Sequence, residues 1–487
     1  MCNNINFIYP KFLIIFLFSF FCVSVLKGQE APEIIWTKTF ESITPEGVII
    51  NSTQKTSDGG YVAYGYKEQN TSTLCYVIKL NELGNKIWEK YYSPTGYSGG
   101  YSIRQTSDGG YVILGGSKDG TGDKDCWVMK LDADGNKKWD KTYGGSNNDS
   151  IFSIQQTSDG GYILAGYTES NDGDISDGNN GSQDCWIIKL NAIGNKVWDK
   201  TYGGSRWDEA ASIQQTSDGG YIFSASISST DGDVNSDCFG YSCADVWVVK
   251  LNSVGDKVWD KVYGDDFPTD YARMIQKTLD GGYVLIFTSY TSNGQGFSSV
   301  IKLNNSGNEE WSNTEFGPFS YDYNSPRIIH QTKDGGYLIG GHTQNTSIVD
   351  LNRDWLTKLD SLGNKSWHKD FVGRNNINSI KQTADGGYVV GSRKWLVKLG
   401  ADISVSTNDI KNEKNNFTIY PNPANSQVAI GTDLIQPIGE VLITDMTGKI
   451  VKQFQTQKST KEIDISTLEN GIYFVKAGGA SQKLVKK

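Results

Sequence analysis

Two short stretches of the sequence contain closely spaced aspartates that could bind a hard cation. The stretches read NDGDISDG and TDGDVNSD, and both alternate acidic residues with glycine. Ca2+ prefers six or more oxygen ligands, which loops of this composition can present. Neither loop has a downstream glutamate at the spacing of a known calcium loop, so solvated turn residues are the alternative. The residues of the calcium prediction are Asp172, Asp174, Asp177, Asp231, Asp233 and Asp237.

A second set of polar residues recurs where the chain enters a strand. Asp149, Asp208 and Asp270 occupy one equivalent position in a repeated phrase. If these positions meet at the mouth of a central channel, their carboxylates could hold a cation or a polar ligand. The alternative is that they fix the preceding loop. Trp207 lies outside the positions at which the other tryptophans recur. Its ring could stack on a sugar or a peptide, or anchor its own loop.

Groups suited to catalysis are few in this sequence. The histidines are His330, His342 and His368, and no serine or cysteine nucleophile signature accompanies them. His330 replaces a glutamine of the repeat and is the least ordinary of the three. Because a catalytic site usually breaks internal symmetry, the regular repetition favours a non-catalytic binding or adhesion module for a glycan or a protein. The alternative is a secreted glycan-active enzyme, a hydrolase or a lyase, with its site at the channel mouth.

An internal repeat provides the elements that position these residues. The phrase Thr-x-Asp-Gly-Gly-Tyr occurs seven times, at intervals of 50 to 62 residues. A phrase ending in Lys-Leu follows each copy, and a Trp-x-Lys phrase or a near variant also occurs seven times. Each unit reads as four short strands with period-two alternation, joined by turns that contain glycine. Four-stranded units of this size bury their faces when they are arranged radially.

The order of the phrases predicts how the ring closes. The first Trp-x-Lys phrase, at Trp36, precedes the first complete unit, whereas the last unit, which ends near Gly400, lacks one. We therefore predict an all-β fold in which residues 29–400 form a seven-bladed β-propeller and the N-terminal strand completes the last blade. This closure removes an open sheet edge. Twelve of the 13 tryptophans fall at two positions of the repeat, which predicts that they pack between blades.

The N-terminus has the layout of a secretory signal peptide over residues 1–28. Lys11 precedes an apolar run from Phe12 to Leu26 that is too short to span a bilayer comfortably. The sequence has no other apolar run of spanning length, so no transmembrane segment is expected in the mature chain. The net charge of −9 argues against a nucleic-acid partner.

The cysteines add little to the functional argument. Cys75, Cys126 and Cys185 share one strand position in successive units and are expected to be buried as small apolar residues. Cys238 and Cys243 lie in one long loop and could form a disulfide in an oxidising compartment.

The C-terminal region differs from the repeat and carries its own motifs. After a polar linker at 401–416, the sequence continues with FTIYPNPANSQVAI, VLITDMTGKIVKQF and ENGIYFVKAGG. It resembles the C-terminal sorting domain of the type IX secretion system over 417–487, and its alternation predicts a small β-sandwich. The resemblance implies recognition by the type IX machinery and a product that is secreted or attached to the outer-membrane surface. The matching residues are Tyr420, Pro421, Asn422, Pro423, Asp445, Gly448, Gly471, Tyr473, Lys486 and Lys487.

The propeller repeats also resemble known sequences. As an array they are similar to repeats of secreted proteins from Bacteroidetes-type bacteria. The run KLDADGNKKW is similar to the hairpin of quinoprotein-type repeats. Since this sequence has no adjacent cysteine pair and no recognisable cofactor site, that second resemblance implies only the fold, and no cofactor is expected beyond the Ca2+ considered above.

Overall fold

The chain divides into two compact units, Met1–Ile403 and Ser404–Lys487, and each is described by itself. The computed structural model describes residues 30–487 except for 41–43, 46, 70–71, 94–95, 119–122, 235–243, 265–268, 293, 315, 318–322, 345–352, 373–375, 403–416, 433–438, 446–448, 457–459 and 478–479. The predicted signal peptide and disulfide lie outside these residues. Among the described residues, no helix is long and apolar enough to span a membrane.

The first unit consists of seven four-stranded antiparallel blades. Blade 1 contains β2 (Val48–Lys55), β3 (Tyr61–Gln69), β4 (Ser72–Leu80) and β5 (Lys86–Tyr92). Blade 2 contains β6 (Tyr97–Gln105), β7 (Tyr111–Lys118), β8 (Lys124–Leu131) and β9 (Lys137–Tyr143). Blade 3 contains β10 (Asp149–Gln156), β11 (Tyr162–Thr168), β12 (Asp184–Leu190) and β13 (Lys196–Tyr202). Blades 4 and 5 contain β14 (Asp208–Gln215), β15 (Tyr221–Ile227), β16 (Asp245–Leu251) and β17 (Lys257–Tyr263); and β18 (Thr269–Lys277), β19 (Tyr283–Tyr290), β20 (Gly296–Leu303) and β21 (Glu309–Asn313). Blades 6 and 7 contain β22 (Tyr323–Gln331), β23 (Tyr337–Gln344), β24 (Arg353–Leu359) and β25 (Lys365–Val372); and β26 (Ser379–Gln382), β27 (Tyr388–Gly391), β28 (Trp395–Leu399) and β1 (Ile34–Thr39).

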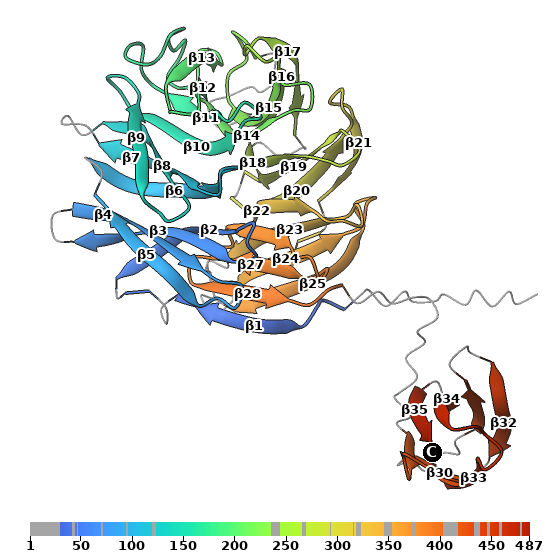
Figure 1. Cartoon of the computed structure of the whole chain (residues 1–487). Helices are drawn as coiled ribbons and strands as arrows, with labels where there is room; N and C mark the ends of the chain where they lie inside the picture. Colours follow the sequence, from blue (N-terminus) through green and yellow to red (C-terminus); the bar gives the residue numbers. More distant parts are fainter. Residues whose placement is uncertain are drawn as a thin grey trace, which may run out of the picture. The chain divides into compact units, whose positions relative to one another are not determined.

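The N-terminal strand closes the ring, as predicted. β1 pairs antiparallel with β28, and Trp36 lies opposite Lys398. Backbone bonds at both ends extend this pairing, since Gly400 N donates to Glu33 O and Phe40 N donates to Lys394 O. Figure 1 shows the blades following one another around the ring, with β1 beside β28 at the point where the two ends of the array meet. The fold is therefore a seven-bladed β-propeller.

The turn between the first two strands of each blade requires glycine at two successive positions. In blade 3, Gly160 has a φ of +80°, which other residues rarely adopt. A Cβ atom on Gly161 would lie 2.2 Å from the carbonyl oxygen of Leu190. The same two-glycine turn recurs in every blade because the neighbouring backbone leaves no room for a side chain.

A buried lysine from the third strand closes this turn. Lys189 Nζ lies 2.8 Å from Asp159 Oδ2 and donates to the carbonyl oxygen of Leu190 at 2.9 Å. Asp159 also accepts bonds from the Thr157 hydroxyl and from Gly161 N. The turn containing each of these aspartates was predicted from the sequence, but no role was predicted for the lysine of the Lys-Leu phrase. The seven pairs are Lys79–Asp58, Lys130–Asp108, Lys189–Asp159, Lys250–Asp218, Lys302–Asp280, Lys358–Asp334 and Lys398–Asp385.

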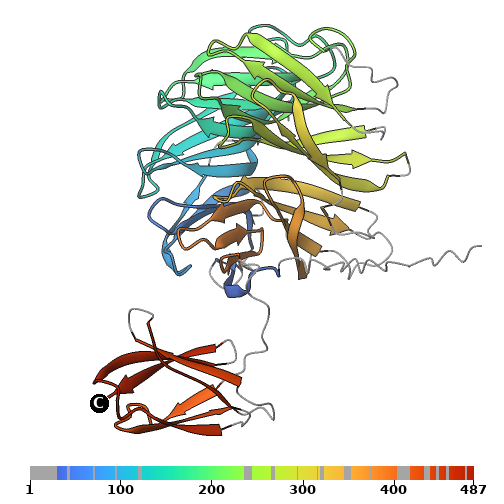
Figure 2. The same cartoon turned by 90° about the vertical axis from the view of Figure 1, so that its right-hand side faces the viewer.

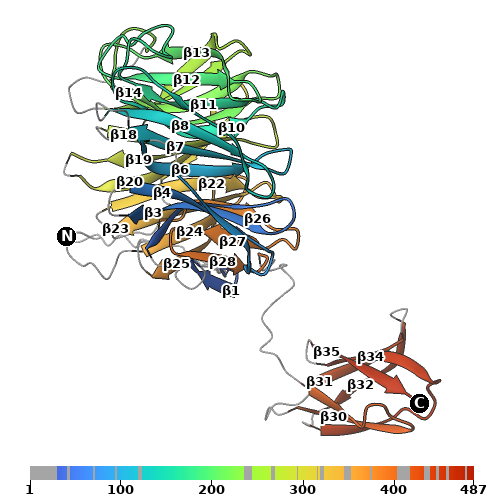
Figure 3. The same cartoon turned by 60° about the vertical axis from the view of Figure 1, so that its left-hand side comes forward.

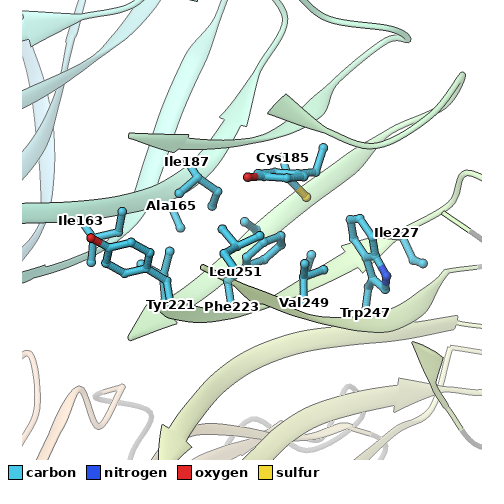
Figure 4. Packing of buried hydrophobic residues seen from close by; sticks show 14 of the residues in the cluster. Ile163, Ala165, Cys185, Ile187, Tyr221, Phe223, Ile227, Trp247, Val249 and Leu251 are labelled. Atoms are coloured by element: carbon cyan, nitrogen blue, oxygen red, sulfur yellow. The ribbon is translucent and has the colours of Figure 1, made fainter. Parts of the chain in front are cut away.

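The repeated tryptophans pack between blades, which confirms the prediction made from their positions. Trp198 of blade 3 contacts Tyr221 of blade 4 with ring centroids 5.8 Å apart. Figure 4 shows part of the apolar cluster at this interface, to which Ile187 of blade 3 and Phe223 and Trp247 of blade 4 belong. Seven such pairs, with centroids 5.6 to 6.3 Å apart, form a circuit around the ring: Trp36–Tyr61, Trp88–Tyr111, Trp139–Tyr162, Trp198–Tyr221, Trp259–Tyr283, Trp311–Tyr337 and Trp367–Tyr388.

The interfaces between blades are otherwise filled by aliphatic residues and small apolar groups. Cys75, Cys126 and Cys185 are buried free thiols within them, as expected. Figure 3 shows strands of blades 2 and 3 side by side, the arrangement that these interfaces bury.

The C-terminal unit is a small β-sandwich. One sheet has the order β29–β30–β33 and the other has the order β32–β31–β34–β35. Apolar residues of both sheets form one buried cluster, which includes Ile430, Val441 and Val475. Figure 2 shows the two sheets face to face. The strands are β29 (Phe417–Tyr420), β30 (Gln427–Thr432), β31 (Gly439–Thr444), β32 (Ile450–Thr456), β33 (Thr460–Asp464), β34 (Gly471–Ala477) and β35 (Ala480–Lys486).

Candidate functional site

The first strands of the blades face the middle of the ring (Figure 1). Residues of these strands line two pockets. We name the pocket on the long-loop side the mouth pocket; its volume is about 560 Å³. The pocket on the side of the two-glycine turns is the throat pocket, of about 490 Å³. Arg104 lines both of them and therefore lies where they meet.

Aromatic side chains form one wall of the mouth pocket. Tyr66, Tyr101 and Phe152 line it, and Tyr101 is 42% exposed. The rings of Tyr101 and Phe152 pack edge to face with centroids 5.7 Å apart, and Tyr167 lies 5.9 Å behind Phe152. These contacts hold Tyr101 in place while leaving its ring available to a ligand.

Arginines dominate the charge of the mouth pocket. Arg104, Arg327 and Arg393 line it, and Glu68 is the one carboxylate among the described residues of its lining. Arg327 Nε donates to Nδ1 of the buried His342 at 3.1 Å. This bond orients the guanidinium group, and it requires His342 to be unprotonated at Nδ1. The arrangement suits a ligand that combines a flat apolar face with hydrogen-bond acceptors.

Two tiers of glutamines surround the throat pocket and link successive blades. In the first tier, Gln54 Oε1 accepts from Gln105 N of the next blade at 2.6 Å. In the second tier, Gln105 Oε1 accepts from Ser57 N of the preceding blade at 2.7 Å. Each inner strand presents a free edge to the channel, and these side chains cap its N–H groups. Equivalent first-tier bonds join Gln155 to Gln215, Gln214 to Lys277 and Gln276 to Gln331.

Three basic residues replace first-tier glutamines, and one of them is His330, which was noted in the sequence because it replaces a glutamine of the repeat. They are Arg104, His330 and Lys381, and all three line the throat pocket. Burial lowers the pKa of His330 to about 4, and the charge of Lys381 adds to this shift. Burial also lowers the pKa of Lys381, with a further contribution from Arg104. Lys381 therefore lies near both His330 and Arg104.

The predicted ring of carboxylates does not line either pocket. Asp149, Asp208 and Asp270 are fully buried where the chain crosses from one blade to the next. Asp149 Oδ2 accepts from Gly145 N at 2.7 Å, and Asp208 Oδ2 accepts from Gly204 N at 2.9 Å. These bonds support the alternative that the sequence left open, in which the carboxylates fix the crossing loops.

Trp207 packs within the protein at one edge of the long-loop side. Its ring stacks on Tyr271 with centroids 6.0 Å apart and planes inclined by 17°. Its backbone forms a parallel bridge with Gln183 of the preceding blade. The side chain is half-buried and does not line the mouth pocket, so its position is that of a loop anchor.

The two acidic loops fold back onto the crossings. Asp172 Oδ1 accepts from Ser146 N at 2.7 Å, and Asp231 Oδ1 accepts from Ser205 N at 2.7 Å. Within the described part of the chain, no group of three or more His, Cys, Asp or Glu side chains is arranged to hold a metal ion. A calcium site here stays a prediction. Asp174, Asp177 and Asp233 are described, whereas Asp237 lies outside the described residues.

A pair of buried carboxylates that the sequence did not reveal lies at the crossing from blade 3 to blade 4. A Cβ atom on Gly203 would lie 2.4 Å from Asp184 Oδ1 and 2.7 Å from Asp208 Oδ2, so both oxygens pack against this glycine. Asp184 Oδ1 is buried and has no hydrogen-bond partner among the described residues. Burial raises the pKa of Asp184 to about 6, and the nearby Asp208 charge adds to the shift, although Asn180 N donates to this carboxylate.

This geometry predicts that Asp184→Asn stabilises the protein above pH 6. A carboxyl whose folded pKa exceeds its unfolded value binds protons preferentially in the folded state, so ionisation removes stability as the pH rises from about 4 to 6. The asparagine amide can instead donate toward Asp208. We expect a higher melting temperature than wild type at pH 8 and a smaller difference at pH 4, as measured by calorimetry.

The exposed Asp134→Asn provides a control for this prediction, since it also removes one carboxylate but from an open turn. A melting temperature of Asp184→Asn below that of the wild type at pH 8 would contradict the predicted stabilisation. That result, together with stabilisation of the wild type by Ca2+, would instead indicate that the ionised pair holds a cation.

The sorting-motif residues hold the C-terminal sandwich together. Asn422 Nδ2 donates to Lys483 O at 2.6 Å, and Val485 N donates to Asn422 Oδ1 at 2.9 Å, which ties the Tyr-Pro-Asn-Pro segment to β35. Tyr473 is buried and donates to Glu469 O at 2.9 Å. Asp445 closes the turn after β31, with Oδ1 accepting from Lys449 N at 3.1 Å. Gly448 lies outside the described residues.

Comparison with known proteins gives one family match and several distant structural likenesses. Residues 418–487 match the family model described as "Secretion system C-terminal sorting domain". No curated protein matches the sequence. One structural likeness is to a protein of unknown function from Bacteroides caccae, with 11% identity and a TM-score of 0.37, covering 64% of this chain and 94% of that one.

Two further solved structures have similarly low sequence identities and TM-scores. Hydrazine synthase from Kuenenia stuttgartiensis has 13% identity and a TM-score of 0.41, with 62% of this chain and 76% of that chain covered. PorZ, a surface component of the type IX secretion system of Porphyromonas gingivalis, has 11% identity and a TM-score of 0.30, with 88% of this chain and 69% of that chain covered. The propeller assignment rests on the strand pairing of this chain itself. With its C-terminal sorting domain, the protein is a β-propeller that the type IX secretion system exports to the cell surface or the medium.

Proposed function

We propose that the propeller is a non-catalytic binding module that takes a glycan into the mouth pocket at the cell surface or outside the cell. The observation that carries the proposal is the combination of an exposed, rigidly held aromatic ring with hydrogen-bonding groups in one open pocket. Tyr101 offers the ring, and Asn376 and Arg393 line the same pocket. Sugar rings present apolar C–H faces and hydroxyl groups, which such a pocket complements.

The lining of the mouth pocket favours binding over hydrolysis. Glycoside hydrolases usually act through two carboxyl groups that flank the scissile bond. Among the described residues that line the mouth pocket, Glu68 is the only Asp or Glu, and arginines accompany it. Neither His330 nor His368 lines this pocket, and His342 serves to orient Arg327.

Glycan-array binding of the purified exported protein tests the proposal. Tyr101→Ala is expected to weaken binding of the recognised glycan about tenfold, since a stacking contact contributes on the order of 1 kcal/mol beyond its buried area. Tyr91→Ala is the matched control, because Tyr91 is 40% exposed on the outer strand of blade 1 and lies outside the pocket. The fall in affinity should be absent in that variant.

Three results would contradict the proposal. The first is that no glycan on the array binds, and the second is that Tyr101→Ala binds as tightly as the wild type. The third is turnover of a polysaccharide, which would favour the alternative of a secreted glycan-active enzyme.

A further inference from the structure

The throat pocket departs from the pattern that the propeller repeats elsewhere. Four of the seven first-tier positions hold glutamine, and each of these side chains accepts a backbone N–H from the next blade. The other three hold Arg104, His330 and Lys381. Arginine and lysine have no acceptor atom, so at their positions the tier cannot form its bond to the next strand. Each loss removes a stabilising hydrogen bond between neighbouring blades.

The substitutions also concentrate positive charge where the protein has no acid to balance it. Lys55, Arg104, Lys277 and Lys381 line the throat pocket, and no Asp or Glu is found among the described residues that line it. The whole chain carries a net charge of −9, so this excess does not follow from overall composition. Arg104 Nη1 has a partner in the Ile103 carbonyl oxygen at 2.9 Å, but that oxygen carries no charge.

We propose that the throat pocket binds an oxyanion between Arg104, His330 and Lys381. A carboxylate, sulfate or phosphate group accepts hydrogen bonds from guanidinium, ammonium and imidazole N–H groups at once, and charge-assisted bonds of this kind are the strong ones. The bound anion also offsets the repulsion between the charges of Arg104 and Lys381. The pocket volume of about 490 Å³ exceeds that of a single oxyanion, so hydrating water or the rest of a larger molecule can enter with it. Arg104 also lines the mouth pocket, but His330 and Lys381 line the throat pocket alone, so the site does not depend on glycan binding in the mouth pocket.

The repeat itself provides the substitutions that test the site. Arg104→Gln and Lys381→Gln restore the residue that four other blades use at this position, so both variants are expected to fold. Calorimetric titration with sodium sulfate and with sodium phosphate, at an ionic strength held constant with sodium chloride, should show saturable binding to the wild type. Each variant is expected to bind about tenfold more weakly, because it loses a charge-assisted bond.

Lys333→Gln is the charge-matched control. Lys333 is exposed on the two-glycine turn of blade 6 and does not line the throat pocket, so its loss should leave the affinity unchanged. His330→Gln separates the imidazole contribution from that of the two permanent charges. In all four variants the melting temperature without added anion reports whether the fold is intact.

The source of the oxyanion is distinguished by a second titration with galacturonic acid, its trisaccharide and the neutral maltotriose. Tighter binding of the acidic sugars than of sulfate would assign the site to the acid group of a glycan, whereas the reverse would assign it to a free inorganic anion. The proposal is overturned if neither sulfate, phosphate nor galacturonate binds in excess of chloride. It is also overturned if Lys381→Gln and Arg104→Gln bind these anions as tightly as the wild type and Lys333→Gln do.

Discussion

Deletion of Ala31–Phe40 is expected to lower the unfolding free energy of the propeller by more than about 5 kcal/mol, because it removes one strand pairing and two aromatic anchors together. β1 is the fourth strand of blade 7, and Phe40 is 3% exposed at its end. Without β1 the outer edge of β28 becomes unpaired. An unpaired edge recruits other strands, so dimers or larger aggregates should accompany the lower melting temperature. Calorimetry and size-exclusion chromatography measure the two effects.

A pair of point substitutions separates closure from ordinary packing. Trp36→Ala removes the Trp36–Tyr61 contact at the closing point, and Trp198→Ala removes the equivalent Trp198–Tyr221 contact inside the chain. Each should cost about 2–3 kcal/mol, since both rings are half-buried. Trp36 lies on β1, which no hairpin turn joins to its partner β28, whereas Trp198 lies on β13, which directly follows its partner β12 in the chain. Only Trp36→Ala should therefore increase self-association. A deletion variant that melts like the wild type and stays monomeric would refute the closure model.

The number of blades and their closure could be predicted from the sequence because each repeated phrase encodes a local structure. The glycines of the two-glycine turn and the alternation of the strands depend on neighbouring residues alone. The tryptophans could be assigned to blade interfaces for a related reason, since large apolar rings at a fixed position in a strand must be covered. The order of the phrases then determined which strand closes the ring.

The contacts that could not be predicted join side chains distant in sequence. Lys189 reaches Asp159 across two strands, and Gln54 reaches Gln105 in the next blade. Such contacts depend on strand register and on the direction of each side chain, which a repeat count does not give. The same limit applies to Asp149. Its position near a strand entry suggested a ligand site, but its side chain turns into the crossing loop and is fully buried.

Candidate binding residues were missed for a different reason. Tyr101 and Arg393 lie in different blades and belong to no repeated phrase, so only the folded ring brings them to one pocket. His330 was an exception, because it interrupts a repeated glutamine. Arg104 and Lys381 interrupt the same position and carry the same signal. The proposed anion site therefore consists of departures from the internal repeat, whereas the repeated residues themselves serve the fold.

The second large effect is expected from Asp159→Asn, which should destabilise the protein by about 2 kcal/mol at pH 7. The substitution keeps the acceptor for Gly161 N but leaves the ammonium group of Lys189, whose side chain is 6% exposed, without a carboxylate. Burial alone raises the pKa of Asp159, but the bonds from Lys189, Thr157 and Gly161 outweigh it and lower the pKa to about 2. The stabilisation is therefore complete above pH 4 and is lost as the pH falls toward 2.

The double variant Asp159→Asn/Lys189→Met provides the control for this ion pair. A buried charge without a partner is costly, whereas an apolar side chain of similar length in its place is tolerated. We therefore expect the double variant to recover at least half of the stability lost by Asp159→Asn, as measured by urea denaturation at pH 7. The difference between the wild type and Asp159→Asn should shrink as the pH falls from 4 to 2 and vanish below the folded-state pKa of about 2, where the carboxylate is protonated in both the folded and unfolded states of the wild type. Equal stability of wild type and Asp159→Asn at pH 7 would mean that water, rather than the aspartate, satisfies the ammonium group. Because the same pair occurs in all seven blades, that result would apply to every turn of this kind in the ring.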